Sequence, residues 1–501
     1  MEILDTTLRD GEQTSGVSFS ASEKLSIVRL LLEELKVDRV EIASARVSDG
    51  EYDAVNKIIQ WANKNGYCHR LEVLGFVDGC NSLNWVKATG CKVMNLLCKG
   101  SLKHCKEQLG KTPEEHAADI ESILQKAKQM NIEINLYLED WSNGMISSPE
   151  YVFFLVDRLK NTSIKRFMLP DTLGILNPDN TAQFCRQMIQ RYPNIHFDFH
   201  AHNDYDMAVG NVFAAARAGI KGVHTTVNGL GERAGNAPLT SVIAVLHDHL
   251  KLKTNIIEKN LFMASRIVSS YSGIRIPNNK PVTGDSVFTQ CAGIHADGDN
   301  KNNLYCNDLL PERFGRMREY ALGKMSGKAN IKRNLESLGI ELDDKSMRKV
   351  TERIIELGDK KEIVTQDDLP FIISDVLHNE NTETIKLVNY SLSLAHGLRP
   401  TATVRIRIDG SEYEFTAPGD GQYHAFSKAV WKIYTKLNKP KPVLTDYVVS
   451  IPSGGRTDAL VQTVISWNFN GKDFKTRGLD VDQTVAAIKA TVKMLNMIEN
   501  M

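Results

Sequence analysis

Residues 194–203 read NIHFDFHAHN, and this stretch is the most informative one about the fold. Its β-rich composition predicts a strand over residues 194–202. His200 and His202 are two positions apart, so both imidazoles point to the same face of that strand. An HxH pair by itself is more often structural or exposed than metal-binding. Because polar Asn203-Asp204 follow at the strand end, the stretch favours a divalent-metal site completed by a carboxylate.

Further β-rich runs alternate with amphipathic helical stretches along residues 1–260. They span residues 2–5, 38–43, 70–76, 92–98, 131–139, 164–170 and 221–227. A helix is expected over residues 21–35 with a capping box from Ser20 and Glu23, and another begins at Pro149. This series of strand–helix units predicts an α/β fold of the TIM (β/α)8 barrel type. An open doubly wound sheet is the alternative, although no GxGxxG follows the first strand.

Polar residues of catalytic type follow several of these strands. They are Asp5, Arg9 and Asp10 after the first strand, Glu139 after the fifth, Asp171 and Thr172 after the sixth, and His200 and His202 after the seventh. In a TIM barrel the carboxyl ends of all strands meet at one mouth, where the active site lies. This clustering favours the barrel and predicts the position of its active site.

The composition narrows the class of protein. The chain has 501 residues, 61 Lys and Arg against 61 Asp and Glu, and a hydrophobic fraction of 42%. The balanced charge argues against a nucleic-acid-binding protein, and no apolar run approaches the ~20 residues of a membrane helix. Its eight cysteines form no CxxC pair, which suits reduced thiols. We therefore expect a cytoplasmic multidomain enzyme without nucleic-acid or membrane partners.

The sequence pattern changes after residue 260. A polar segment rich in Gly and Asn, residues 293–305, leads into short helices and then into a β-rich module. Residues 406–415 and 467–476 align at an offset of 61 residues, and helices are expected after each copy, at 421–436 and 483–498. The repeat predicts an α+β module with two-fold pseudosymmetry that binds a ligand or dimerises. We place the domains at residues 1–260, 261–384 and 385–501.

Several motifs taken together resemble one enzyme family. They are residues 5–13 (DTTLRDGEQ), residues 200–203 (HAHN) and residues 229–236 (GLGERAGN). They are similar to the metal-dependent TIM-barrel enzymes of Claisen-type acyl-CoA condensation, which include isopropylmalate, homocitrate and citramalate synthases and related lyases. The resemblance continues through His295, residues 323–328 (GKMSGK) and the C-terminal repeat, so it covers essentially the whole chain.

Three more segments resemble the citramalate-forming members of this family. They are residues 71–79 (LEVLGFVDG), 95–104 (NLLCKGSLKH) and 135–144 (NLYLEDWSNG). One departure is Thr240, where the family usually has Glu. Because Asn236 is kept, we expect the departure to affect a contact to the metal-binding residues and not the metal-binding residues themselves.

The resemblance implies the following roles. Asp10, His200 and His202 would bind a divalent metal with Asn236 at or near its coordination sphere, and Mn²⁺ or Mg²⁺ is favoured over Zn²⁺. The catalytic residues would be Arg9, Glu139 and His295. Pyruvate would contact Arg9, Asp10, Leu74, Leu97, Tyr137 and Thr172, and acetyl-CoA would contact His295, Asp297, Asn303, Leu304 and Tyr305.

These implied roles are chemically coherent. A bound metal polarises the 2-oxo carbonyl, Arg9 neutralises the alkoxide, and Thr172 can donate to the carboxylate. Glu139 and His295 are the acid/base candidates for the methyl proton of acetyl-CoA. Large side chains such as Leu97 leave room for a methyl group, which favours pyruvate, although leucines on barrel strands are also ordinary core residues.

The resemblance also implies a homodimer whose residues 385–501 bind isoleucine as a feedback inhibitor. The expected effector site consists of Tyr423, Leu444, Tyr447, Ile451, Thr457 and Val461. Aliphatic and aromatic walls suit a branched side chain. The same residues could instead form the core of a dimerisation domain.

Three other functions stay open. The nearest is an isopropylmalate synthase that uses 2-oxoisovalerate on the same scaffold. A metal-dependent aldolase or lyase shares the barrel, but the family's lyases lack the two-copy C-terminal module. An amino-acid sensor on a degenerate barrel is disfavoured because Arg9, Asp10, His200, His202 and Glu139 are all present.

Overall fold

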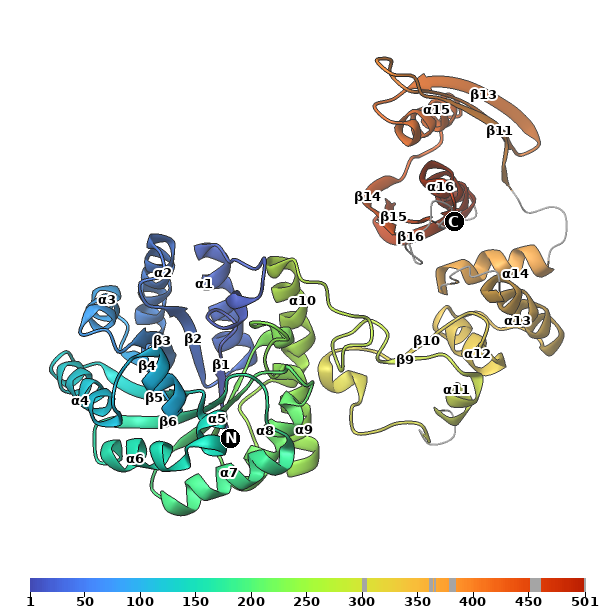
Figure 1. The fold of residues 1–501 in the computed structure, drawn as a ribbon. Helices are drawn as coiled ribbons and strands as arrows, with labels where there is room; N and C mark the ends of the chain where they lie inside the picture. Colours follow the sequence, from blue (N-terminus) through green and yellow to red (C-terminus); the bar gives the residue numbers. More distant parts are fainter. Residues whose placement is uncertain (300–303, 360–363, 365, 378–383, 451–460, 500–501) are drawn as a thin grey trace. The chain divides into compact units, whose positions relative to one another are not determined.

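The computed structural model describes residues 1–299, 304–359, 364, 366–377, 384–450 and 461–499. The chain forms two compact units (Figure 1). The first comprises Met1–Phe288 and Cys306–Arg318, and the second comprises Thr289–Tyr305 and Glu319–Met501.

Parallel strands of the first unit close into a barrel. They are β1 (Glu2–Asp5), β2 (Arg39–Ser44), β3 (Leu71–Phe76), β4 (Val93–Lys99), β5 (Glu133–Glu139), β6 (Ile164–Asp171), β7 (Phe197–Ala201) and β8 (Gly222–Thr225). Each strand pairs with the next along the chain, and β1 pairs with β8, which closes the sheet. The predicted TIM barrel is confirmed, and the open sheet is excluded.

Helices form an outer ring around this barrel (Figure 1). They are α1 (Ala21–Arg29), α2 (Asp49–Asn65), α3 (Asn81–Thr89), α4 (Pro113–Gln129), α5 (Trp141–Ser147), α6 (Pro149–Leu159), α7 (Pro178–Arg191), α8 (Ala208–Ala218), α9 (Leu239–Leu250) and α10 (Leu261–Ser272). As predicted, Pro149 occupies the first turn of α6.

The helix predicted over residues 21–35 has two parts. It begins with the predicted capping box, in which the Ser20 hydroxyl accepts from the Glu23 N–H and the Glu23 carboxylate accepts from the Ser20 N–H. The α-helical part ends at Arg29, and Leu30–Leu35 continue as a π-helix whose leucines are all buried. Consecutive leucines span a narrower arc in this wider turn, which lets them reach the core together.

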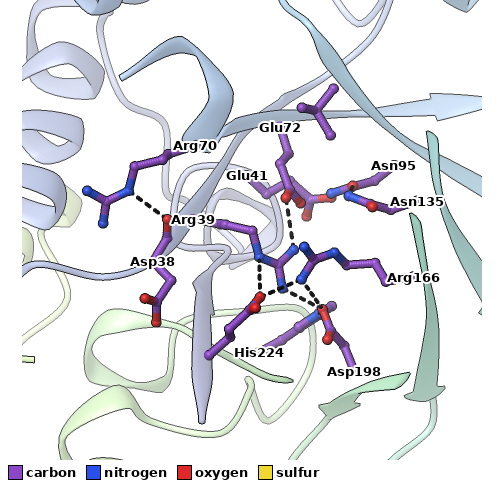
Figure 2. Close-up of polar contacts among 12 residues, drawn as sticks. Asp38, Arg39, Glu41, Arg70, Glu72, Asn95, Asn135, Arg166, Asp198 and His224 are labelled. Atoms are coloured by element: carbon purple, nitrogen blue, oxygen red, sulfur yellow. Dashed lines mark hydrogen bonds and ion pairs between the residues drawn. The ribbon is translucent and has the colours of Figure 1, made fainter. Parts of the chain in front are cut away.

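Paired charges fill part of the barrel interior. Arg39 of β2 lies between Glu72 of β3 and Asp198 of β7, at 2.8 and 2.5 Å (Figure 2). Nearer the carboxyl ends of the strands, the Asn95 amide donates to Glu41 at 2.7 Å. Buried charges are tolerated when each has a partner of opposite sign or a hydrogen bond. This layer therefore underlies the barrel mouth without leaving an isolated charge.

The second unit begins with a helical segment. Its elements are β9 (Thr289–Gln290), α11 (Gly293–Asp299), β10 (Glu319–Tyr320), α12 (Lys328–Ser337), α13 (Asp344–Asp359) and α14 (Leu369–Leu377). β9 and β10 pair in parallel. Ile331, Leu335, Val350 and Ile354 belong to an apolar core shared by α12 and α13.

The C-terminal module contains one βββα motif twice. The first copy is β11 (Ile385–Ser393), β12 (Thr401–Ile408), β13 (Ser411–Pro418) and α15 (Gln422–Lys436), and the second is β14 (Val443–Ser450), β15 (Val461–Phe469), β16 (Lys472–Asp480) and α16 (Gln483–Glu499). Asp409-Gly410 and Asn470-Gly471 turn the equivalent hairpins, all with positive φ, as type I′ turns require. The predicted repeat is confirmed.

The prediction missed the first strand of each copy, β11 and β14. β14 is exposed along most of its length and so lacks the alternating pattern that indicates a strand. Within the described part of the chain, we find no helix that combines the length and apolar character needed to cross a membrane.

Candidate active site

Asp10, His200 and His202 meet at the carboxyl end of the barrel strands. Asp10 follows β1, His200 lies in β7, and His202 comes just after that strand. Asp10 Oδ2 is 3.3 Å from Nε2 of His200 and 3.7 Å from Nε2 of His202. One possible ligand atom of each residue lies within 4.8 Å of the others, and all three residues are buried. The arrangement can hold a metal ion.

Several buried polar atoms in this region have no hydrogen-bond partner among the described residues. They are Asp10 Oδ1, His200 Nδ1, His202 Nδ1 and Asn236 Oδ1. Asn236 is a direct neighbour of His202, to which an antiparallel β-bridge joins it. Buried polar atoms without a partner are costly, and nitrogen and oxygen donors of these types bind divalent metals. The donor set therefore fits a divalent ion.

The charge state of the three residues suits metal binding. Burial lowers the pKa of His200 and of His202 to about 4, so both rings are neutral near pH 7 and offer a lone pair. Burial by itself would raise the pKa of the Asp10 carboxyl, but the charge of Arg9 holds that pKa well below its usual range. The cluster thus presents one carboxylate and two neutral imidazoles.

The Arg9 guanidinium is held from three directions. It donates to Asp10 at 2.9 Å, to Glu41 at 2.5 Å and to the Tyr137 hydroxyl at 3.4 Å. A guanidinium fixed in this way can stabilise negative charge without reorganising. Glu41 was missed by the prediction, although an acidic residue between Val40 and Ile42 in the predicted strand 38–43 was an available signal.

Glu139 ends β5 and forms an ion pair with Lys99, the last residue of β4. The next residue, Asp140, has a left-handed backbone with φ of 66°, and its N–H donates to Thr172 Oγ1 at 2.9 Å. The Thr172 hydroxyl accepts this bond, which leaves its own proton for another acceptor. The prediction missed Lys99, because the predicted strand ends at residue 98 and the sequence does not give the register that pairs Lys99 with Glu139.

Leu74, Leu97 and Tyr137, which were predicted to contact the oxoacid, belong to one apolar cluster. Its members are Leu4, Leu74, Leu97, Tyr137 and Met168. The Tyr137 ring meets the His200 ring edge-on, with centroids 6.1 Å apart, so the cluster adjoins the possible metal ligands. Leu4 and Met168 were missed because their contact with the others depends on the register between strands.

The glycine-rich loop after β8 needs glycine at Gly235. Its φ is 88°, and a Cβ there would lie 2.0 Å from the carbonyl oxygen of Gly229. Arg233 joins the loop to Asp204 at 2.8 Å. Thr240, the departure from the family pattern, is buried in the first turn of α9.

Comparison with known proteins agrees with this architecture. Residues 1–268, more than half of the chain, match the HMGL-like family. The chain belongs to the HMGL-like family. Residues 282–362 of this HMGL-like enzyme match the homocitrate synthase post-HMGL domain-like family, and residues 363–499 match the LeuA allosteric (dimerisation) domain. The predicted family and the prediction of an enzyme are confirmed.

Its curated relatives extend over the whole chain. (R)-citramalate synthase of Methanocaldococcus jannaschii is 33% identical over 504 residues, which cover 100% of both chains. 2-Isopropylmalate synthase of Nitratidesulfovibrio vulgaris is 30% identical over 509 residues, covering 99% of this chain and 96% of the relative. 2-Isopropylmalate synthase of Nitrosococcus oceani is 30% identical over 504 residues, covering 99% and 97%.

The residues predicted to bind acetyl-CoA lie in the second unit of the HMGL-like enzyme. His295 is in α11, as is Asp297, and the His295 ring packs on Tyr305 with centroids 4.4 Å apart. Leu304 and Tyr305 are exposed, and Asn303 lies outside the described residues. Contact of these residues with acetyl-CoA stays a prediction.

The predicted effector residues lie in the LeuA-type domain. Tyr423 of α15 and Tyr447 of β14 are brought together, with ring centroids 5.5 Å apart, and the Tyr423 hydroxyl hydrogen-bonds Thr491 at 2.8 Å. The others are Leu444, exposed in β14, and Val461, at the start of β15, while Ile451 and Thr457 lie outside the described residues.

Proposed function

We propose that this HMGL-like enzyme condenses acetyl-CoA with pyruvate and water to give (R)-citramalate and coenzyme A. Relatives named citramalate synthase and 2-isopropylmalate synthase support the coarser reaction, condensation of acetyl-CoA with a 2-oxoacid. The observation that carries the proposal is the buried cluster of Asp10, His200 and His202 with Arg9 bonded to Asp10. Such a cluster suits a reaction in which a carbonyl oxygen gains negative charge.

A divalent ion held by Asp10, His200 and His202, with Asn236 beside them, would polarise the 2-oxo carbonyl as a Lewis acid, with Mn²⁺ or Mg²⁺ favoured and Zn²⁺ possible. Arg9 would neutralise the alkoxide that forms when this carbonyl is attacked. The free proton of the Thr172 hydroxyl suits donation to the substrate carboxylate.

The carbon nucleophile comes from acetyl-CoA. Glu139 or His295 would take a proton from the acetyl methyl group, and the resulting carbon would bond to the pyruvate carbonyl carbon. Tyr305, which packs on His295, would help to position the thioester. Water then cleaves the thioester and releases coenzyme A as a free thiol.

Free thiol provides the test of this proposal. Purified enzyme is given acetyl-CoA with pyruvate, 2-oxobutyrate or 2-oxoisovalerate, and the released thiol is measured with a colour reagent. We expect the highest kcat/KM with pyruvate. A higher value with 2-oxoisovalerate would make the chain an isopropylmalate synthase. Absence of oxoacid-dependent thiol release would leave an aldolase, a lyase or a sensor.

Pocket size is expected to set the choice of acceptor. Leu97→Val and Leu74→Val each remove one methylene from the apolar cluster, which opens space for the extra methyl group of 2-oxobutyrate. We expect each variant to raise the kcat/KM ratio of 2-oxobutyrate to pyruvate by about tenfold. Leu96→Val is the matched control, because Leu96 precedes Leu97 on β4 and points to the opposite face. An equal change in the control would contradict this role.

We also propose that residues 385–501 bind isoleucine and inhibit the barrel domain of a homodimer, with residues 261–384 as the linker between them. The paired rings of Tyr423 and Tyr447 support an apolar site for a branched side chain. Tyr447→Ala should raise the half-inhibiting concentration of isoleucine at least about tenfold, because the variant loses one of the two aromatic walls of the site, and tenfold corresponds to only about 1.4 kcal/mol of binding free energy. Tyr413→Ala, which removes a ring from β13, is the control. Leucine titrated in parallel separates the two effectors, and unchanged inhibition in Tyr447→Ala would contradict the site.

A further inference from the structure

His224 is a buried residue of β8 that has no role in the chemistry described above. Its ring lies between two side chains of other strands. Nδ1 is 3.0 Å from the hydroxyl of Tyr137, and Nε2 is 3.3 Å from Asp198 Oδ2. In Figure 2, His224 and Asp198 lie next to each other within the charged layer around Arg39. One imidazole thus connects this layer to the wall of the candidate active site.

The hydrogen-bond partners determine the direction of each bond. Asp198 pairs with the Arg39 guanidinium at 2.5 Å, and the oxygens of a carboxylate in such an ion pair only accept hydrogen bonds. His224 Nε2 must therefore carry the proton. The Tyr137 oxygen accepts from Arg9, and a guanidinium cannot accept a proton in return, so the hydroxyl proton is directed at Nδ1 of His224.

The Tyr137 hydroxyl is consequently held from two sides. It donates to His224, and its oxygen accepts from Arg9 Nη2 at 3.4 Å. The ring of Tyr137 also contacts the rings of His200 and His224, with centroids 6.1 and 5.5 Å apart. Any rotation of this ring would change both the apolar wall and the contact with Arg9.

We propose that His224 is a positioning residue that fixes the Tyr137 hydroxyl and thereby sets the width of the acceptor pocket. This inference rests on the proposed function, because it concerns which 2-oxoacid is accepted. His224 acts through Tyr137 and need not touch the substrate. Asp198 accepts from Nε2 and so holds the imidazole in the required tautomer, and the ion pair with Arg39 holds that carboxylate in place.

Two amide substitutions distinguish the hydrogen bond made by Nδ1 of His224 from the one made by Nε2. His224→Asn places an amide oxygen near the position of Nδ1, so it can still accept from Tyr137 while it loses Asp198. His224→Gln reaches the position of Nε2 and Asp198, and it leaves the Tyr137 hydroxyl without its acceptor. We expect His224→Gln to raise the kcat/KM ratio of 2-oxobutyrate to pyruvate by about fivefold, and His224→Asn to stay within about twofold of wild type.

Tyr137→Phe provides an independent measurement that removes the hydroxyl itself. This variant should show the same change in the ratio, and adding His224→Gln to it should change nothing more, as expected for residues that act through one contact. His196→Gln is the control for disturbance of the charged layer, since His196 also bonds Asp198, at 2.8 Å, from outside the pocket. It should leave the ratio at the wild-type value, and thermal unfolding verifies that each variant is folded.

Equal ratios in His224→Gln and His224→Asn would overturn the inference, because the role of His224 would then be merely structural. An unchanged ratio in Tyr137→Phe would overturn it too, even if the His224 variants failed to fold. A wild-type enzyme that prefers 2-oxoisovalerate would instead overturn the proposed function. In that case a kcat/KM ratio of 2-oxobutyrate to pyruvate that differs between His224→Gln and His224→Asn would still show that His224 positions the acceptor pocket.

Discussion

Exchange of His200 for alanine is expected to lower the rate of the proposed condensation at least ~100-fold, the scale expected when a metal site is disrupted. His200 Nε2 lies 3.3 Å from Asp10 Oδ2, and its ring is buried and neutral near pH 7. Alanine removes one of the three donors and leaves only Asp10 and His202 to hold the ion. Thiol release from acetyl-CoA with pyruvate measures the rate, and calorimetric titration with Mn²⁺ measures the loss of affinity.

His69→Ala is the control for this experiment, because His69 is exposed and far along the chain from the cluster. It should keep both the rate and the Mn²⁺ affinity of wild type. His202→Ala should resemble His200→Ala, since both rings face Asp10. Full activity of enzyme freed of metal by a chelator would contradict the proposed role of the cluster.

Loss of Arg9 should affect both catalysis and stability. Its guanidinium bonds Asp10, Glu41 and Tyr137, and it is largely buried. In Arg9→Leu the developing alkoxide loses its cation, so we expect kcat to fall about 10²–10³-fold. Two buried carboxylates also lose their ion-pair partner, which we expect to cost about 3–5 kcal/mol of the free energy of unfolding. Thiol release and urea unfolding measure the two effects.

The stability loss in Arg9→Leu should depend on pH in a defined direction. Burial already raises the pKa of Glu41, and removal of the Arg9 charge should raise it further. A carboxyl whose pKa is higher in the folded state than in the unfolded state keeps its proton to a higher pH when folded. The free energy of unfolding therefore falls as pH rises from the unfolded-state pKa to the folded-state pKa. The variant should therefore be closer to wild type in stability at pH 5 than at pH 8.

Arg9→Lys tests whether charge alone is sufficient. A lysine ammonium can neutralise the buried carboxylates, but it lacks the fork that bonds Asp10 and Glu41 simultaneously. We expect most of the stability to return while kcat stays well below wild type. Equal kcat in Arg9→Lys and wild type would argue against a geometric role for the guanidinium.

The strand-end residues were predictable because they depend on local sequence. The period of two places His200 and His202 on one face of β7, and the polar residues after β1 and β6 mark the barrel mouth. Strand position therefore placed Asp10, His200 and His202 at one mouth, and the family resemblance implied that they share a metal. The bounds of local elements were less certain, as the π-helical end of the helix after Ser20 illustrates.

Pairings between strands were not predictable in the same way. Glu41, Lys99 and His224 contact Arg9, Glu139 and Tyr137, and in each pair the partners belong to segments far apart along the chain. These contacts depend on which strands are neighbours, on their register and on the closure of the barrel. Leu4 and Met168 join the wall of the pocket for the same reason.

The sequence by itself determined the barrel, the repeated C-terminal module and the residues at the strand ends, because hydrophobic period, turn residues and motif spacing are local properties. Only the tertiary structure decided that Asp10 adjoins both histidines, that Arg9 is held by Glu41, and that His224 joins Tyr137 to Asp198. Inward-facing side chains from different strands meet only after the sheet has closed. Their distances and protonation states then follow from burial and from charges that the chain brings together over long separations.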